Sequence, residues 1–412
     1  MDVVYERCCG LDIHKKVVVA CLVTPEDDRA GGAPRKEVRT FGTMTDDLLA
    51  LSDWLAAAGC THVAMESTGV YWKPVFNLLE GSFALLLVNA QHVKQVPGRK
   101  TDVKDCEWLA DLLRHGLLRG SFVPDRPQRE LRELTRYRTA LLHERSAEVN
   151  RLQKTLEGAN VKLASVATDI MGKSGREMLA ALVAGETDGK TLAQLAKGQL
   201  RAKLPQLERA LTGRMSAHQR FLLAQQLAHV DFLDQQLERV SAEIRERLRP
   251  FEPALAALEG IPGVGRRTAE VLVAELGTDM TRFPTAGHLA SWAGMCPGNN
   301  ESAGKRRSGR TRKGSPWLRA ALVEAARAAA HTKRSYLGAQ YRRLAARRGA
   351  KRAAVAVGHT ILVIAHHLLR DGTPYQDLGV TYFDERDRLA VERRLVRRLE
   401  TLGYSVTLQP AA

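Results

Sequence analysis

The first 125 residues alternate between short apolar runs and longer amphipathic segments. The short runs predict strands at residues 7–13, 16–23, 36–43, 62–68 and 83–90. The longer segments predict helices at residues 45–59, 70–81 and 102–116, the first of them opening on Thr45 and Asp46 as candidate caps. Three strands followed by a helix, and then a strand, helix, strand and helix, indicate an α/β domain around one mixed sheet.

The pattern changes near residue 125, where helical and charge-rich sequence begins. One stripe roughly 100° wide, interrupted by Arg145, collects the apolar residues of a long predicted helix. Its members are Leu131, Leu134, Leu141, Leu142, Val149, Leu152 and Leu156. A second long helix is predicted over residues 216–248. Such helices usually pair, either within one chain or between two chains, so the middle of the chain is predicted to be a coiled coil.

A third region begins with the glycine-containing segment at residues 258–277 and continues to a helical C-terminus. The predicted fold class is therefore α/β plus α, with a mixed-sheet domain, a helical middle and a mostly helical C-terminal domain. The expected divisions are residues 1–125, 126–252, 253–345 and a helical extension over 346–412. The pattern assigns this extension no role beyond packing and nucleic-acid contact.

Charge is concentrated in one part of the chain. The 62 Lys and Arg residues exceed the 46 Asp and Glu residues by 16. Between Lys305 and Arg352 there are 16 basic residues and one acid, Glu324, which leaves a local balance of +15. A localised basic excess is typical of a surface that binds nucleic-acid phosphates, because charge that serves only solubility is spread along a chain.

Membrane and disulfide architectures are disfavoured. The longest apolar runs, at residues 17–23 and 84–88, are far shorter than the roughly 20 residues that span a bilayer. No apolar signal-peptide core is found near the start of the sequence. Six cysteines lack CxxC spacing and are expected to be reduced thiols: Cys8, Cys9, Cys21, Cys60, Cys106 and Cys296. A cytoplasmic protein without a membrane partner is expected.

Four acids in the first domain are candidate metal ligands. Asp12 lies in the first predicted strand, and Glu66 lies towards the end of a later one. Asp102 and Asp105 open a predicted helix three residues apart, on one face. Four converging carboxylates would form an all-oxygen site suited to Mg²⁺ or Mn²⁺, and two such ions about 4 Å apart would flank a scissile phosphate.

A structural interpretation fits the same spacing. Aspartates such as Asp102 and Asp105 are also common at the start of a helix, where they cap it. Asp12 and Glu66 could be exposed to solvent at the ends of their strands. Spacing alone does not decide between the two interpretations. The order Asp, Glu and Asp-x-x-Asp on strand, strand and helix resembles that of RuvC-like nucleases of the ribonuclease-H fold, which favours the metal site.

Two C-terminal segments are candidates for nucleic-acid contact. Residues 260–277 resemble a helix-hairpin-helix, in which Gly263 and Gly265 would allow backbone N–H groups to hold a phosphate. A glycine turn between two core helices is the alternative. Further along, six basic residues occupy nine positions, and they can bind phosphate oxygens: Lys305, Arg306, Arg307, Arg310, Arg312 and Lys313.

Serines lie among these basic residues, at positions 302, 308 and 315. A serine hydroxyl there could attack a phosphodiester while the surrounding cations neutralise the charge that develops on phosphorus. Composition alone favours the simpler interpretation, a solvated basic loop whose serines only form hydrogen bonds.

The chain resembles the DEDD transposases of the insertion-sequence one-hundred-and-ten family, which includes the Piv-type DNA invertases. The matching segments occur in the family's order across most of the chain. They are GLDIHKK (10–16), AMESTGVYW (64–72), NAQHVKQVPGRKTDVKDCEWLADLLRHGLL (89–118), LRELTRYR (131–138), IPGVG (261–265) and ASWAGMCPGNNESAGKRRSGRTRKG (290–314).

This resemblance implies a RuvC-like domain, a coiled-coil middle and a C-terminal transposase domain. By motif position, Asp12, Glu66, Asp102 and Asp105 would be the metal-binding tetrad. Ser302 would be the nucleophile, with Ser308 as a second candidate. Members resemble one another in using a structured non-coding RNA that pairs with donor and target DNA, and in acting as dimers to tetramers.

The resemblance also implies that arginines of the middle helices contact this RNA. The candidates are Arg132, Arg136, Arg138, Arg145, Arg151 and Lys154. The expected function is excision and insertion of an insertion sequence by DNA strand cleavage and rejoining. Two alternatives are a metal-dependent, structure-specific endonuclease that cleaves with activated water, and a non-enzymatic nucleic-acid-binding protein whose acids are structural.

Overall fold

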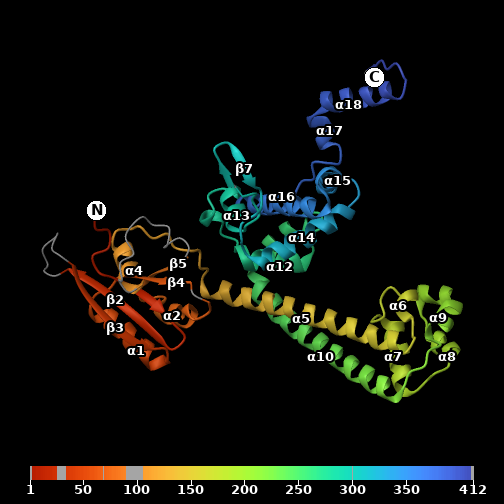
Figure 1. The fold of residues 1–412 in the computed structure, drawn as a ribbon, viewed down its shortest axis with the longest axis horizontal. Coiled ribbons are helices and arrows are strands. Elements are labelled where there is room, and N and C mark those ends of the chain that lie inside the picture. The colour runs from red at the N-terminus through yellow and green to blue at the C-terminus, as the bar shows by residue number, and fades with distance from the viewer. Residues whose placement is uncertain (1, 26–33, 68, 90–104, 299, 410–412) are drawn as a thin grey trace. The chain divides into compact units, whose positions relative to one another are not determined.

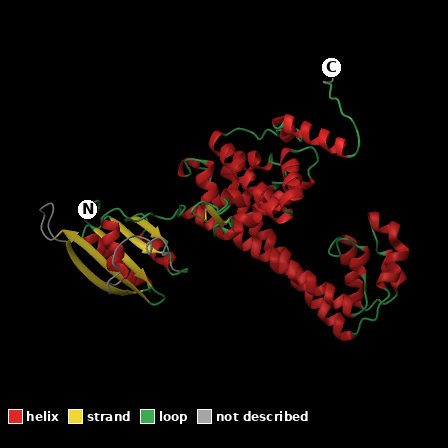
Figure 2. Ribbon diagram, turned by 45° about the horizontal axis from the view of Figure 1, so that its top comes forward, coloured by secondary structure: helices red, strands yellow, loops and turns green. Residues whose placement is uncertain are grey.

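A computed structural model describes residues 2–25, 34–67, 69–89, 105–298 and 300–409 (Figure 1). The chain forms two compact units, Met1–Pro124 and Asp125–Ala412. The first unit contains a mixed sheet and the second is almost entirely helical (Figure 2). The prediction of an α/β part followed by an α part is therefore confirmed.

The N-terminal unit is built on a five-stranded sheet in the order β3-β2-β1-β4-β5. Its strands are β1 (Cys8–Ile13), β2 (Val17–Pro25), β3 (Pro34–Gly42), β4 (His62–Glu66) and β5 (Ala84–Val88). β2 pairs antiparallel with both β1 and β3, whereas β1, β4 and β5 run parallel. All five predicted strands are confirmed, with ends that differ by a few residues.

Helices cover both faces of this sheet. α1 (Thr45–Ala57) and α2 (Trp72–Leu79) pack on the face formed by Cys9, Leu11 and Met65. α4, described over Asp105–Arg114, packs on the opposite face with Cys8 and Ala64. Successive side chains of a strand point to opposite faces, so the residues of β1 that face α4 are Cys8, Gly10 and Asp12.

The start of α1 differs from the expected cap. The N-cap residue is Met44, which makes no side-chain capping hydrogen bond, so the prediction that Thr45 or Asp46 caps this helix is wrong. Asp46 and Asp47 instead lie in the first turn. Acids in the first turn interact favourably with the helix dipole. The polar residues after Met44 therefore mark the first turn of the helix and not its cap.

The second unit contains the coiled coil. α5 (Arg126–Gly158) and α10 (Ala217–Leu248) lie side by side and antiparallel (Figure 1). The buried residues of α5 recur every three or four positions, and they include polar side chains as well as leucines. They are Leu131, Thr135, Arg138, Leu141, Glu148, Leu152 and Leu156. The predicted Leu134, Leu142 and Val149 are only half-buried.

A small helical body closes the far end of the coiled coil. It comprises α6 (Leu163–Val166), α7 (Lys173–Ala184), α8 (Gly189–Gln194), η1 (Gly198–Lys203) and α9 (Leu204–Leu211). Leu163, Met178, Leu192 and Leu207 are fully buried within it, together with Leu156 from α5. The helical periodicity of the middle region indicated helices here but not a separate core.

The remaining elements form a compact C-terminal bundle followed by two exposed helices. They are η2 (Arg249–Phe251), α11 (Glu252–Glu259), α12 (Arg266–Leu276), η3 (Met280–Arg282), α13 (Ala286–Trp292), β6 (Asn300–Ser302), β7 (Lys305–Ser308), α14 (Pro316–His331), α15 (Tyr336–Arg348), α16 (Ala350–Asp371), α17 (Tyr382–Arg386) and α18 (Arg388–Thr401). α16 is central, because it packs against α11, α13, α14 and α15.

α15 spans the boundary expected at residue 345, and α16 begins five residues beyond it. Ala353, Val357 and Ile361 are fully buried, and His366 hydrogen-bonds through Nε2 to the carbonyl of Phe283 at 2.9 Å. Residues 350–371 therefore belong to the core of the C-terminal bundle and not to an appended extension. Among the described helices, α16 is also the one long and apolar enough to cross a membrane, but half of that stretch is buried, as expected of a core helix.

Ion pairs join α5 to α12. Arg138 and Glu270 are both buried and lie 2.6 Å apart between Nη1 and Oε2. Arg136 makes two hydrogen bonds to the carboxylate of Glu275, at 2.8 and 3.0 Å. Only 4% of the Arg138 side chain is exposed, and Glu270 occupies it. The expectation that Arg138 contacts RNA stays a prediction, and in this structure Arg138 joins the two helices.

Arg145 and Arg151 occupy different surroundings on α5. Arg145, which interrupts the apolar stripe of α5, forms an ion pair with Asp234 of α10. This pair joins the two helices. Arg151 pairs with Glu148 but leaves 62% of its side chain exposed, and it stays a candidate for nucleic-acid contact.

We expect Arg138→Ala to lower the free energy of unfolding by about 3 kcal/mol, because Glu270 would remain buried with only Arg266 nearby. Arg126→Ala on the same helix is the control, since the Arg126–Glu130 pair is solvent-exposed and should matter far less. Urea unfolding followed by circular dichroism measures both variants. Equal losses of stability would show that the buried pair has no special role.

Candidate catalytic and nucleic-acid-binding sites

Asp12 and Glu66 lie at the same level on neighbouring parallel strands. The register pairs Leu11 of β1 with Met65 of β4, so the next residues along, Asp12 and Glu66, are adjacent. Ala64 faces α4, and Glu66, two residues further along β4, shares that face. Both acids therefore belong to the α4 face, at the carboxyl end of β1 and β4.

The start of α4 reaches the same place. A Cβ atom added at Gly10 would lie 2.2 Å from the carbonyl oxygen of Cys106, so only glycine allows this close approach of α4 to β1. Burial raises the pKa of the Cys106 thiol, and the negative charges of Glu107 and Asp12 raise it further. The Asp12 carboxylate is thus close enough to the first turn of α4 to affect it electrostatically.

Two of the four candidate ligands, Asp12 and Glu66, are therefore neighbours at one end of one sheet face. Asp105 is the first described residue of α4, directly before Cys106, whose carbonyl oxygen approaches Gly10 of β1. Asp102, the fourth candidate, lies outside the described residues. The backbone thus brings the start of α4 close to the strand that carries Asp12.

The donor chemistry fits a hard divalent cation, because all three described candidates are carboxylates. Asp12 has 30% of its side chain exposed, and its Oδ2 lies 3.1 Å from Nε2 of His14. Within the described residues, however, no group of three or more His, Cys, Asp or Glu side chains is placed to hold a metal ion. The metal site stays a prediction.

Ser302 lies in a β-hairpin rather than in an irregular loop. β6 and β7 pair antiparallel, and Ser302 is the last residue of β6, opposite Lys305. Ala303 and Gly304 form the turn with φ angles of 51° and 72°, the geometry of a tight hairpin. The side chains of Ser302, Arg306 and Arg307 lie outside the part of the structure that is described.

The base of this hairpin is a close contact between two backbone segments. The amide of Gly298 donates to the carbonyl of Arg310 at 3.1 Å. A Cβ atom at Gly294 would lie 2.7 Å from the nitrogen of Gly314, so glycine is needed there too. We call residues 294–298 and 310–314 the hairpin neck.

Four of the six predicted basic residues are exposed, and none of the four forms an ion pair within the described part of the chain. They are Lys305, Arg310, Arg312 and Lys313. Ser308, the second candidate nucleophile, is half-buried, and its Oγ accepts a hydrogen bond from the amide of Arg310. Cations without carboxylate partners remain available to bind phosphate.

The glycine turn between α11 and α12 has two distinct glycines. Gly263 has a φ of +88°, and a Cβ atom there would lie 2.3 Å from the carbonyl of Ala325 in α14. Packing between core helices therefore accounts for Gly263. Gly265 is the N-cap of α12 with open space around its Cα, and it stays a candidate for phosphate contact.

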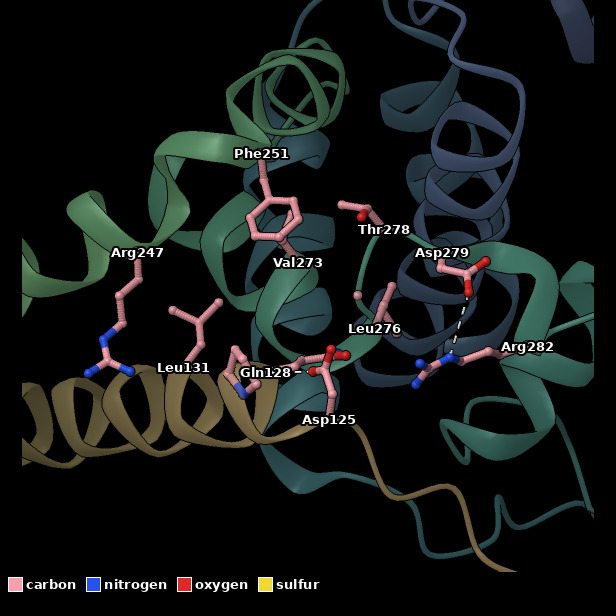
Figure 3. A pocket seen from close by; sticks show the side chains of 12 residues that line it. Asp125, Gln128, Leu131, Arg247, Phe251, Val273, Leu276, Thr278, Asp279 and Arg282 are labelled. Atoms are coloured by element: carbon pink, nitrogen blue, oxygen red, sulfur yellow. Dashed lines mark hydrogen bonds and ion pairs between the residues drawn. The ribbon is translucent and has the colours of Figure 1, made fainter. Parts of the chain in front are cut away.

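A pocket of about 280 Å³ lies where α5 begins and where α10 and α12 end (Figure 3). Its apolar wall is formed by Leu131, Val273 and Leu276. An ion pair between Asp279 and Arg282 lies at its edge. None of the candidate catalytic residues lines this pocket. The sequence offered no signal for it, because its walls come from segments far apart along the chain.

Two buried acids of α12 were missed by sequence reasoning. Glu270 and Glu275 are 2% and 1% exposed and neutralise arginines of α5. Both acids lie among the apolar residues of a predicted helix, just as Asp12 lies among the apolar residues of a predicted strand. A buried acid among apolar residues indicates a compensating partner, but not whether that partner is a metal or an arginine.

Comparison with known proteins identifies the family of the chain. A model of the DEDD transposases of IS110 matches residues 9–161, and a model described as "Transposase IS116/IS110/IS902 family" matches residues 255–342. A "Probable family 20 transposase" of Pseudomonas aeruginosa is 26% identical over 270 residues, which cover 65% of this chain and 70% of that protein. An "Insertion element IS110 uncharacterized 43.6 kDa protein" of Streptomyces coelicolor is 44% identical over 70 residues, 16% of each chain.

The two family models do not overlap, and they match the chain in sequence order. The first contains the sheet acids and the whole of α5, and the second contains the glycine turn, the β6–β7 hairpin and α14. The chain belongs to the IS110 family of transposases.

Proposed function

We propose that this transposase excises and inserts an insertion sequence by cleaving and rejoining DNA strands, with a carboxylate-bound metal centre and Ser302 as the nucleophile. The observation that carries the proposal is that Asp12 and Glu66 lie side by side on the α4 face of the sheet, with the start of α4, which carries Asp105, packed closely against β1. The strand order, with an antiparallel β1–β2–β3 half and parallel β4 and β5, supports a RuvC-like assignment for this unit.

Asp12, Glu66, Asp102 and Asp105 would hold the divalent ions. Bound Mg²⁺ or Mn²⁺ would supply neutralisation of the charge on a scissile phosphate. The protein's own contribution is geometric: strands β1 and β4 hold two carboxylates at one level, and the Gly10 contact fixes the first turn of α4 beside them.

Ser302 would attack phosphorus through its hydroxyl oxygen. A serine–phosphate bond would form as a phosphodiester bond of the DNA breaks, and the strand's sugar oxygen would leave. The energy of the phosphodiester would thus be kept in the covalent intermediate for rejoining. Lys305 and Arg310, exposed beside the serine's strand, would attract the phosphate.

A structured guide RNA and assembly into dimers or tetramers complete the proposal. Exposed Arg151 on α5 is one candidate RNA contact, and Gly265 at the start of α12 is a candidate phosphate contact of a helix-hairpin-helix. Assembly would allow the serine of one subunit to work beside the acids of another.

Ser302→Ala should abolish covalent protein–DNA adducts and excised circles, because the attacking oxygen is gone, while binding to DNA persists. A plasmid that carries the gene with its flanking DNA provides the substrate in cells, and adducts are trapped by denaturing gel. Ser308→Ala is the matched control and should retain both products. Continued strand cutting by the Ser302 variant would favour a water-activating endonuclease.

Asp12→Asn and Asp105→Asn should each abolish cleavage, since losing one charged ligand weakens divalent-ion binding at an all-carboxylate site. Chelation by EDTA should have the same effect on the unmodified protein, and added Mg²⁺ or Mn²⁺ should reverse it. Asp46→Asn, an exposed acid on α1 beyond the opposite sheet face, should leave cleavage unchanged. Full activity in the first two variants would support a non-enzymatic role for the acids.

Replacing Arg310 and Arg312 together by alanine should reduce the slope of log affinity against log salt by about two, if each arginine contacts one phosphate. The control replaces Arg245 of α10 and Arg249 of η2, which are exposed but paired with acids. Binding to duplex DNA from the element ends is measured at several salt concentrations. An unchanged slope in the hairpin variant would move the DNA contact to another surface.

A further inference from the structure

Glu275, near the end of α12, is a buried carboxylate shared by donors from two other parts of the fold. Arg136 of α5 makes two hydrogen bonds to it, at 2.8 and 3.0 Å. Arg132, one turn earlier on α5, donates to the backbone carbonyls of Ala274 and Glu275. Ala274 and Glu275, near the end of α12, are thereby bound to the beginning of the coiled coil.

Ser315 is the third partner of this carboxylate. Its Oγ donates to Oε2 of Glu275 at 3.2 Å and accepts from the amide of Leu318 at 3.3 Å, which makes Ser315 the N-cap of α14. Ser315 follows Gly314 directly, and Gly314 is part of the hairpin neck. The hairpin that carries Ser302 therefore ends on a residue bonded to Glu275.

The electrostatic surroundings explain why these contacts hold their geometry. Glu275 is 1% exposed, and Arg132 is 11% exposed, so neither charge is well solvated. Burial lowers the pKa of Arg132 to about 10, which leaves it protonated at neutral pH, and the charge of Glu275 opposes this shift. A buried carboxylate in this position must keep its donors, because losing one leaves an uncompensated charge.

We propose that Glu275 is a positioning residue, which sets the Ser302 hairpin relative to α5 through its bonds to Arg136 and Ser315. This inference rests on the proposed function, in which Ser302 attacks DNA. Displacement of a reacting group by about 1 Å can cost a hundredfold in rate, so the anchor of the hairpin affects the rate of chemistry more than the affinity for DNA.

Ser315 offers a cleaner test than Glu275, because replacing Glu275 would leave buried arginines without their acid and disturb folding. Ser315→Ala removes the bond to Glu275 and also the cap of α14, whereas Ser315→Thr keeps both. Ser335→Ala is the matched control: Ser335 caps α15 through the amide of Gly338 but does not contact Glu275.

Three quantities are measured for each variant: the rate of covalent adduct formation with element-end DNA in the presence of co-purified RNA, the affinity for that DNA, and amide hydrogen exchange over residues 294–314. We expect Ser315→Ala to slow adduct formation by about ten- to a hundredfold, to speed exchange of the Gly298 amide, and to leave affinity within about twofold. Ser315→Thr should restore all values, and Ser335→Ala should match the unmodified protein.

Equal adduct rates and equal exchange in Ser315→Ala and Ser335→Ala would overturn the proposal, as would failure of Ser315→Thr to restore them. A joint loss of DNA affinity and adduct formation would also overturn it, because that pattern indicates a merely structural role. If the unmodified protein forms no adduct, the Ser302 mechanism fails, and amide exchange alone then decides whether Glu275 holds the neck.

Discussion

The close packing of α4 against β1 at Gly10 is the contact on which the candidate metal site depends. Without a side chain at Gly10, the carbonyl of Cys106 reaches the strand, and Asp105 arrives at the end of the sheet where Asp12 and Glu66 lie. A residue with a Cβ would push the helix away and separate its acids from those of the strands. One glycine thus joins groups that are about ninety residues apart in sequence.

Buried ion pairs have the corresponding role in the second unit. Glu270 and Glu275 of α12 accept Arg138 and Arg136 of α5, and the same Glu275 also accepts Ser315 at the end of the hairpin neck. Arginine is suited to these contacts because its planar group bonds a carboxylate in pairs. The coiled coil and the β6–β7 hairpin are therefore joined through buried side chains.

Periodicity predicted the elements well and their partners less well. The five strands and the long helices α5 and α10 follow from local patterns of two and 3.6 residues. Burial of Arg138 and the central place of α16 depend on contacts between distant segments, which local patterns do not report. Asp12 and Glu66 lie side by side on neighbouring strands, but their role as metal ligands stays a prediction. The roles of Asp102, Asp105 and Ser302 also stay predictions that rest on motif position.

Anomalous diffraction from crystals grown with Mn²⁺ and uncleavable element-end DNA would test the central claim most directly. The account predicts two manganese peaks about 4 Å apart, bound by oxygens of Asp12, Glu66 and Asp105, with a DNA phosphate beside them. Manganese bound elsewhere, or bound without Asp12 and Glu66, would contradict it.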